Sequence, residues 1–190
     1  MALDAEFSAP DGLEDAARLV GVPDEYQRLW TPHRMAYISG GPDAHDENCP
    51  FCNAPTLDDE KALIVHRGEH AYVVLNLFPY NTGHVLVCPY RHVAMYDEVT
   101  PEEAQEIATL TQQAMRVLRH VTGAHGFNIG MNQGKVAGAG VAGHLHQHVV
   151  PRWATDSNFM PIIAKTKAVP RLLGEMREAI ASAWVENSQI

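Results

Sequence analysis

The sequence has few cysteines, no excess of basic residues and no long hydrophobic run. Three cysteines among 190 residues cannot form the disulfide framework of a small secreted domain. The formal net charge is −9, from 14 Lys and Arg against 23 Asp and Glu, which argues against a broad nucleic-acid-binding surface. No apolar stretch approaches the ~18–20 residues that span a bilayer, and the acidic first residues are unlike a signal peptide. We therefore expect a cytoplasmic protein that binds neither nucleic acid nor membrane.

The composition is that of one globular domain with an extension. Of the 190 residues, 46% are hydrophobic and 19% are charged, which are ordinary values for a chain that buries a sizeable core. Residues 1–45 carry prolines, glycines and acidic residues with only short apolar stretches. We expect residues 1–45 to be an extension packed on the core and residues 46–190 to form the domain.

The order of predicted elements indicates an α+β fold with a mainly antiparallel sheet. Short β-branched runs predict strands over Ala62–Val65, Ala71–Leu75, Gly83–Cys88 and Leu145–Val150. A long central helix is expected after Thr100, because Thr100 and Glu103 match a Thr-x-x-Glu capping box with Pro101 at the first helical position. Gly123 ends this helix. A C-terminal helix is predicted over Val169–Trp184.

His144, His146 and His148 occupy every second position of one predicted strand. Such positions share one face of a sheet, with successive imidazoles about 6.6 Å apart. A cluster of core or solvated histidines is one interpretation, but three polar rings among apolar neighbours are costly to bury without a function. A single zinc ion is a second interpretation, and it cannot bind all three rings because the outer two lie about 13 Å apart.

Nucleophilic catalysis at phosphorus is the third interpretation of these histidines. A neutral imidazole is a good nucleophile near pH 7, and a phosphoimidazole passes its group readily to a second acceptor. Flanking histidines can donate protons to phosphate oxygens or to the leaving group. The glycine-rich segment from Gly134 to Gly140 can bring backbone N–H groups close to the same phosphates.

The Cys49-Pro50-Phe51-Cys52 segment has three interpretations. A redox pair would follow a buried strand and open a helix, whereas this segment follows a polar, loop-like stretch. An unmetallated structural pair is the second. Zinc is the third, since a CxxC supplies two of four tetrahedral ligands and needs two more, of which histidines are the natural candidates.

Three separated motifs resemble the histidine-triad family of nucleotide hydrolases and transferases. The segment from His144 to Pro151 resembles its His-x-His-x-His signature, the segment from Gly83 to Pro89 its Gly-His strand, and Asn132-Gln133-Gly134 its Asn-x-Gly motif. The resemblance covers roughly Cys49 to Trp153. Three motifs in the right order are far more specific than a lone HxHxH.

The resemblance implies roles for individual residues. His146 would attack the α-phosphate of a nucleotide, His148 would contact the phosphate, and His144 and His84 would support the triad. The implied nucleotide-binding residues are Asn76, Leu86, Asn132, Gly138, Ala139, Gly140 and Trp153. Trp153 has two equal interpretations: an aromatic wall near the base, or a tryptophan of the core or of an interface.

Two further features refine this comparison. Relatives commonly have Ala-Gly-Gln-Ser/Thr-Val before the triad, whereas this chain has no glutamine or hydroxyl between Ala137 and Gly143. We expect backbone N–H groups of Ala139 and Gly140 to replace those side chains. Zinc-bearing members of the superfamily imply a closed structural zinc site whose ligands are Cys49, Cys52, His92 and His144.

The segments from Leu29 to Ile38 and from Pro151 to Pro161 resemble a bacterial branch of the family that includes diadenosine tetraphosphate phosphorylases. The implied reaction transfers AMP from a dinucleoside polyphosphate to His146 and then to inorganic phosphate or water. A hydrolase of nucleoside phosphoramidates or adenylylated small molecules remains an alternative, as does a nucleotide-binding sensor without turnover. The family also implies a homodimer, and the additional termini are compatible with a tetramer.

Overall fold

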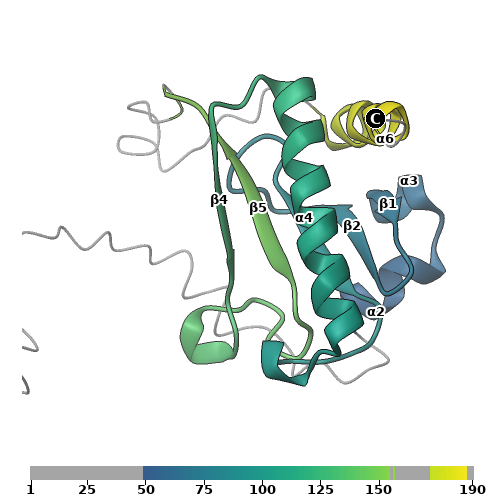
Figure 1. Cartoon of the computed structure of the whole chain (residues 1–190), viewed down its shortest axis with the longest axis vertical. Coiled ribbons are helices and arrows are strands. Elements are labelled where there is room, and N and C mark those ends of the chain that lie inside the picture. Colours follow the sequence, from purple (N-terminus) through teal and green to yellow (C-terminus); the bar gives the residue numbers. More distant parts are fainter. Residues whose placement is uncertain (1–48, 155, 157–171, 188–190) are drawn as a thin grey trace, which may run out of the picture. The chain divides into compact units, whose positions relative to one another are not determined.

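A computed structural model of the protein describes residues 49–154, 156 and 172–187. The chain divides into two units, Met1–Met35 and Ala36–Ile190, and every described residue belongs to the second. The predicted extension over residues 1–45 lies outside the described residues, as does the predicted helix start at Val169. In the second unit, five antiparallel strands form one sheet in the order β1-β2-β3-β5-β4 (Figure 1). The predicted α+β class with an antiparallel sheet is confirmed.

The first hairpin joins β1 (Ile64–Arg67) to β2 (Ala71–Leu75). The second strand lies where the sequence predicted it, whereas the first begins two residues later than the predicted Ala62. The short helix α3 (Asp59–Ala62) uses the start of the apolar run, because the Asp58 side chain caps it and Leu63 ends it in a left-handed conformation with φ of 60°. This local helix wins over β propensity because its N-cap and C-cap are both satisfied.

The central strand β3 (Val85–Pro89) pairs with β2 on one side and with β5 on the other. It begins two residues after the predicted Gly83, which adopts φ of +74° and therefore belongs to a turn. His84 is the last residue of that turn, and its N–H donates to the Asn81 carbonyl at 3.1 Å. The shift keeps His84 at the entrance of the strand rather than within the ladder.

Strand β5 (Gln147–Arg152) lies between β3 and β4 (Gly126–Met131). It begins two residues later than the predicted Leu145, because the Leu145 N–H donates to the Val93 carbonyl in the loop after β3 at 2.6 Å. Only His148 of the three histidines is therefore in the strand. The expectation of three imidazoles evenly spaced on one strand face is wrong. No strand was predicted for β4, whose glycines and exposed middle residues lack the usual β pattern.

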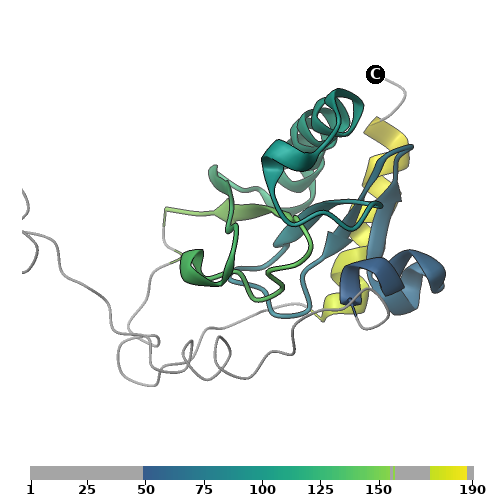
Figure 2. The same cartoon turned by 90° about the horizontal axis from the view of Figure 1, so that it is seen from below.

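The helix α4 (Pro101–Thr122) crosses one face of the sheet, and α6 (Leu173–Asn187) lies beside it and against β1 (Figures 1 and 2). The capping box predicted for α4 is present: Thr100 Oγ1 accepts the Glu103 N–H at 3.2 Å, and Glu103 Oε2 accepts the Thr100 N–H at 2.8 Å. Gly123 caps its C-terminus with φ of 65°. Among the described residues, no helix is long and apolar enough to cross a membrane.

The sheet separates two hydrophobic clusters, and this separation positions the candidate site. Alternate residues such as Val73, Val87 and Val149 face α4 and α6, while their neighbours Tyr72, Leu86 and Cys88 form a smaller cluster on the opposite face. Leu86 is paired in register with His148. Strand β5 therefore presents His148 on the face away from the helices, where the Cys49–Cys52 segment also packs.

Candidate active site and metal centre

The Cys49-Pro50-Phe51-Cys52 segment forms a tight turn that directs both thiols the same way. Cys49 is the N-cap of the short helix α2 (Pro50–Asn53), with Pro50 at its first position. The Cys49 carbonyl accepts the N–H groups of Cys52 and Asn53 at 3.2 and 3.0 Å. The opening of a helix thus sets the spacing of the two sulfur atoms.

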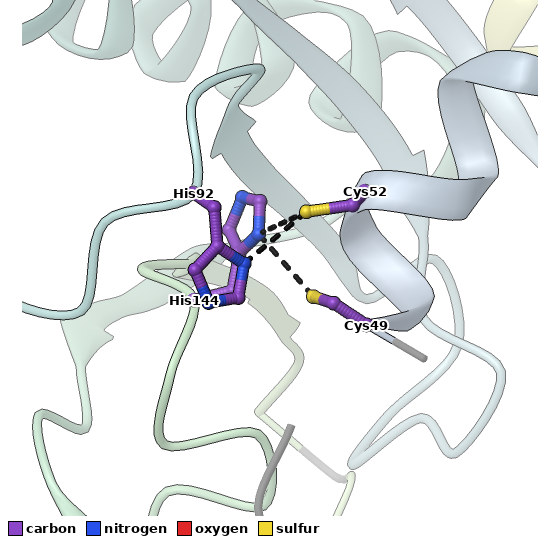
Figure 3. Close-up of side chains that lie close together, drawn as sticks. All are labelled: Cys49, Cys52, His92 and His144. Atoms are coloured by element: carbon purple, nitrogen blue, oxygen red, sulfur yellow. Dashed lines mark hydrogen bonds between the residues drawn. The ribbon is translucent and has the colours of Figure 1, made fainter. Parts of the chain in front are cut away.

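Two histidines from distant segments complete a four-residue cluster with these thiols (Figure 3). The donor atoms of Cys49, Cys52, His92 and His144 all lie within 4.8 Å of one another. His144 Nδ1 lies 3.4 Å from both sulfur atoms, and His92 Nδ1 lies 3.2 Å from Cys52 Sγ. In a tetrahedral zinc site such N···S separations are about 3.5 Å, given metal–ligand bonds near 2.0–2.3 Å.

The protonation of His144 also fits a metal ligand. Its Nε2–H donates to the Pro89 carbonyl at 2.9 Å, so the lone pair of the neutral ring is on Nδ1 and faces the two thiols. A carbonyl acceptor behind a coordinating imidazole is the usual way in which proteins orient such a ligand. His144 is 1% exposed and Cys49 is 0% exposed, whereas Cys52 and His92 are partly buried. The cluster therefore has the donor chemistry of a metal centre, and two of its four members are shielded from solvent.

The His146 imidazole is held as a single tautomer. Its Nδ1 lies 2.8 Å from the His144 carbonyl oxygen, and a carbonyl only accepts, so Nδ1 carries the proton and Nε2 carries the lone pair. Burial lowers the pKa of His146, whereas the hydrogen bond to the carbonyl acts in the opposite direction. The ring is 5% exposed. A buried, neutral imidazole with its Nε2 lone pair available is a nucleophile ready for use near neutral pH.

His84 fixes the orientation of His148 by a second chain of hydrogen bonds. The Tyr80 backbone N–H donates to His84 Nδ1 at 3.0 Å, so the His84 proton is on Nε2. That Nε2–H donates to His148 Nδ1 at 2.9 Å. Neutral His148 consequently carries its proton on Nε2. The ring of His148 lies 5.1 Å from that of His146, so an imidazole with its lone pair on Nε2 lies beside an imidazole that carries an Nε2–H.

The loop between β2 and β3 encloses His84. Asn76 Nδ2 lies 3.2 Å from His84 Nδ1, and Asn76 Oδ1 accepts the Phe78 N–H at 3.0 Å. The Tyr80 ring packs on the imidazoles of His84 and His148, with its centroid 4.8 Å from that of His84 and 5.5 Å from that of His148. Sequence reasoning missed Tyr80. Its proximity to the Asn81–Gly83 turn that precedes His84 was the available signal.

Phe51 is the second residue of the site that sequence reasoning missed. Its ring centroid lies 5.6 Å from that of His144 and 4.9 Å from that of His146. The sequence offered one signal, an aromatic residue inside a CxxC. Nothing in the spacing indicated that its ring would reach the triad.

The expected nucleotide-binding residues lie in three places. Leu86 pairs with His148, and Asn76 contacts His84, so both lie beside the triad. Asn132 follows β4, and Gly138–Gly140 lie in the loop that leads to the triad, where the Ala139 N–H donates to the Gly134 carbonyl at 3.4 Å. Trp153 is not beside the triad: it lies past the opposite end of β5 and donates its indole N–H to the Thr122 carbonyl at 3.2 Å. Its indole is thus bonded to the last residue of α4.

Comparison with known proteins gives the family. The HIT domain family model matches residues 58–155. The chain is 47% identical over 173 residues to the AP-4-A phosphorylase of Mycobacterium tuberculosis, covering 88% of this chain and 89% of that protein. It is also 34% identical over 93 residues to the asymmetrical bis(5'-nucleosyl)-tetraphosphatase of Schizosaccharomyces pombe, which is 49% of this chain and 50% of that protein.

Solved structures show the same fold. A zinc-bound histidine triad family protein from Mycobacterium smegmatis aligns with a TM-score of 0.62 at 24% identity, over 76% of this chain and 99% of that one. A histidine triad nucleotide-binding protein from Sulfolobus tokodaii aligns with a TM-score of 0.59 at 25% identity, over 73% and 93% of the two chains. The resemblance in the sequence motifs is thereby confirmed, and the chain belongs to the histidine triad (HIT) domain family.

Proposed function

We propose that the protein is a nucleotidyltransferase that cleaves dinucleoside polyphosphates at the α-phosphate, with diadenosine tetraphosphate as its substrate. The observation that carries the proposal is the tautomer of His146, whose Nδ1–H is held by the His144 carbonyl at 2.8 Å. That contact leaves the Nε2 lone pair as the nucleophile. The 47% identity to a protein named AP-4-A phosphorylase, over 88% of this chain, supports the substrate class.

The proposed reaction has two displacement steps at phosphorus. In the first, His146 Nε2 forms a bond to the α-phosphorus while the bond to the bridging oxygen breaks, so that ATP leaves from diadenosine tetraphosphate and AMP stays on the imidazole. In the second, an oxygen of inorganic phosphate attacks the same phosphorus, the P–N bond breaks and ADP is released. With water in place of phosphate the product is AMP. Each step is easier than direct transfer, because imidazole is both a good nucleophile and a good leaving group.

Neighbouring residues take supporting roles in this proposal. His148, with its Nε2 proton fixed through His84, donates a hydrogen bond to the phosphoryl group or to the departing oxygen. Asn76 binds the ribose and Leu86 contacts the nucleoside. Asn132 and the backbone of Gly138–Gly140 approach the phosphates.

We propose that the acceptor is inorganic phosphate, and hydrolysis is the second candidate. The name of the Mycobacterium tuberculosis relative favours phosphate. The names of the Schizosaccharomyces pombe tetraphosphatase and of a 34% identical bis(5'-adenosyl)-triphosphatase from Dictyostelium discoideum favour water. The reactive intermediate is the same for both acceptors.

Product analysis tests the proposal. The purified protein is incubated with diadenosine tri- and tetraphosphate, with and without phosphate, and the nucleotides are separated. From the tetraphosphate, ATP plus ADP in the presence of phosphate supports a phosphorylase, whereas ATP plus AMP under both conditions indicates a hydrolase. From the triphosphate, the corresponding products are two ADP and ADP plus AMP. The His146→Gly variant should be inactive, and the exposed His120→Ala on α4 serves as a matched control. Tight nucleotide binding without turnover would instead indicate a sensor.

We also propose that Cys49, Cys52, His92 and His144 hold a structural zinc ion. The support is the donor set and the carbonyl acceptor behind His144. When bound, zinc would supply a closed tetrahedral cross-link with no open coordination position for substrate. The four residues would then tie the α2 turn to the loop after β3 and to the start of the triad.

A homodimer, with a tetramer as the larger alternative, completes the proposal. The support is that β4 is the last strand of the sheet within the described part of the chain and that Asn128, Ile129 and Gly130 are exposed. An exposed strand edge is suited to pairing with a second copy. Light scattering on the purified full chain measures the assembly directly, and a monomer at micromolar concentration would contradict it.

A further inference from the structure

Phe51 connects the metal-ligand cluster to the proposed nucleophile. It is the residue immediately before Cys52, and its ring meets His144 edge-on and His146 in a tilted arrangement, with centroid separations of 5.6 and 4.9 Å. His144 belongs to the four-residue cluster and His146 carries the nucleophilic Nε2. The Phe51 side chain therefore contacts both a member of the metal-ligand cluster, His144, and the proposed nucleophile, His146.

The position of the Phe51 ring depends on how the Cys49–Cys52 turn is held. On its backbone side, the Phe51 carbonyl accepts the Tyr72 hydroxyl at 2.6 Å. On its side-chain side, the ring packs against the cluster on the sheet face away from the helices, which includes Tyr72, Leu86 and Cys88. Because Phe51 is flanked closely by two of the four metal donors, a change in how those donors are held moves this ring.

His146 needs a second restraint beyond its hydrogen bond. The Nδ1–H contact with the His144 carbonyl fixes the proton but leaves the ring free to tilt about that bond. A tilt swings Nε2, which lies on the opposite side of the imidazole, away from the line of attack on phosphorus. A ring packed against the face of the imidazole removes this freedom, and misplacement by about 1 Å costs about a hundredfold in rate.

We propose that Phe51 is a positioning residue for the His146 imidazole, through which metal binding by the Cys49–Cys52 turn orients the nucleophile. The kinetic part of this inference rests on the proposed function, whereas its structural part does not. The metal then influences catalysis without touching the substrate. Phe51 is a side chain of the CxxC turn whose ring contacts the His146 ring directly, whereas the route through His144 reaches His146 by the backbone carbonyl.

The test compares variants of the full-length, metal-loaded protein. Phe51→Leu removes the ring, and Phe51→Tyr keeps it. Phe127→Leu is a matched control, because Phe127 is also partly buried but packs in the α4 core and contacts the Arg119 guanidinium. Three experiments are made on each variant. They give the metal content per chain, the kcat and KM for diadenosine tetraphosphate with phosphate, and the long-range ¹H–¹⁵N spectrum of the His146 ring, assigned with His146→Gly.

We expect Phe51→Leu to keep its metal and to lose about ten- to a hundredfold in kcat, with KM changed by less than about threefold. Its His146 ring signals should shift from their wild-type positions while keeping the Nδ1–H pattern, because the His144 carbonyl still holds that proton. Phe51→Tyr and Phe127→Leu should retain kcat within about twofold. A Phe51→Leu protein that keeps its metal, its kcat and its His146 spectrum would overturn the inference.

Metal removal from the wild-type protein provides a readout that does not need activity. Chelation should shift the His146 signals in the direction seen for Phe51→Leu, and it should shift those of Phe51→Leu little further. An unchanged His146 spectrum after metal removal would refute the coupling.

If Phe51→Leu loses its metal, Tyr72→Phe replaces it as the test. This variant removes the hydroxyl that bonds to the Phe51 carbonyl while all four metal ligands remain, and an unchanged kcat would count against the inference. If wild type fails to cleave the dinucleotide, the proposed function fails while the spectra still decide the role of Phe51.

Discussion

Glu106 of α4 holds the turn between β1 and β2, and its replacement by glutamine tests how strongly. Its Oε1 accepts the Glu69 N–H at 2.9 Å, and its Oε2 accepts the N–H groups of His70 and Ala71 at 2.5 and 2.7 Å. Glutamine has the same shape but presents one NH₂ group in place of an acceptor oxygen. At least one of the three backbone donors therefore loses its partner, and the other contacts lose their charge.

The expected magnitude follows from these contacts. A hydrogen bond to a charged group contributes about 1.5–3 kcal/mol, and water can partly replace it at this half-buried position. We expect Glu106→Gln to lower the free energy of unfolding by about 1.5–3 kcal/mol, since one such bond is lost. For a domain of this size that is a decrease of about 3–12 °C in Tm.

The pH dependence distinguishes this mechanism from general destabilisation. Burial opposes ionisation of Glu106, but the three backbone N–H donors outweigh it, so its pKa lies below the usual value. A carboxyl group whose pKa is lowered by folding adds stability that is fully present above its unfolded pKa of about 4.3 and is lost as the pH falls through the folded value. The difference between wild type and Glu106→Gln should therefore be largest at neutral pH and shrink below about pH 4.

Urea unfolding followed by tryptophan fluorescence at several pH values measures both effects. Glu102→Gln is the control, because Glu102 is an exposed carboxylate in the first turn of the same helix and its replacement should change stability much less than that of Glu106. A loss no larger than that of the control, or one that does not change between neutral and acidic pH, would refute the reasoning.

Three further predictions concern the site. His146→Gly should abolish turnover and leave circular dichroism and nucleotide binding nearly unchanged; residual turnover with a label trapped on another side chain would contradict the assignment of the nucleophile. Cys49→Ser should lower metal content, measured by elemental analysis, and Tm together, and the zinc proposal fails if neither changes. Gly83→Ala should destabilise the protein by about 1–2 kcal/mol, because Gly83 adopts φ of +74° and an added Cβ would lie 3.3 Å from Leu118 Cδ2; a Tm equal to that of wild type would show that this turn is not strained.

Several parts of the fold could be predicted because their causes are local. The capping box at Thr100 and the glycine at the C-terminus of α4 satisfy backbone groups within a few residues, so the sequence alone defines that helix. The run Ala71–Leu75 is a strand because its β-branched and aromatic residues suit a fully buried sheet position. The HxHxH and CxxC motifs could be recognised directly, because their residues lie at fixed spacings in the sequence.

The errors occurred where a distant contact competed with a local pattern. His144 leaves the strand because the Leu145 backbone N–H bonds to the loop that carries His92 and because the Pro89 carbonyl accepts the His144 side-chain Nε2–H. Alternation along the strand cannot contain this information, since the partners are more than fifty residues away in the sequence. β4 escaped prediction for a related reason: it is a strand because β5 lies beside it.

The sequence by itself determined which residues bring chemistry to the protein: three histidines, a pair of thiols, and the glycines that let the chain turn between them. Only the tertiary structure decided what each of them does. The side on which an imidazole keeps its lone pair depends on which carbonyl or N–H faces its other nitrogen, as His146 and His84 show. Those partners are supplied by folding. The ring of Phe51 reaches His146 only because the fold brings the CxxC segment and the histidine segment together.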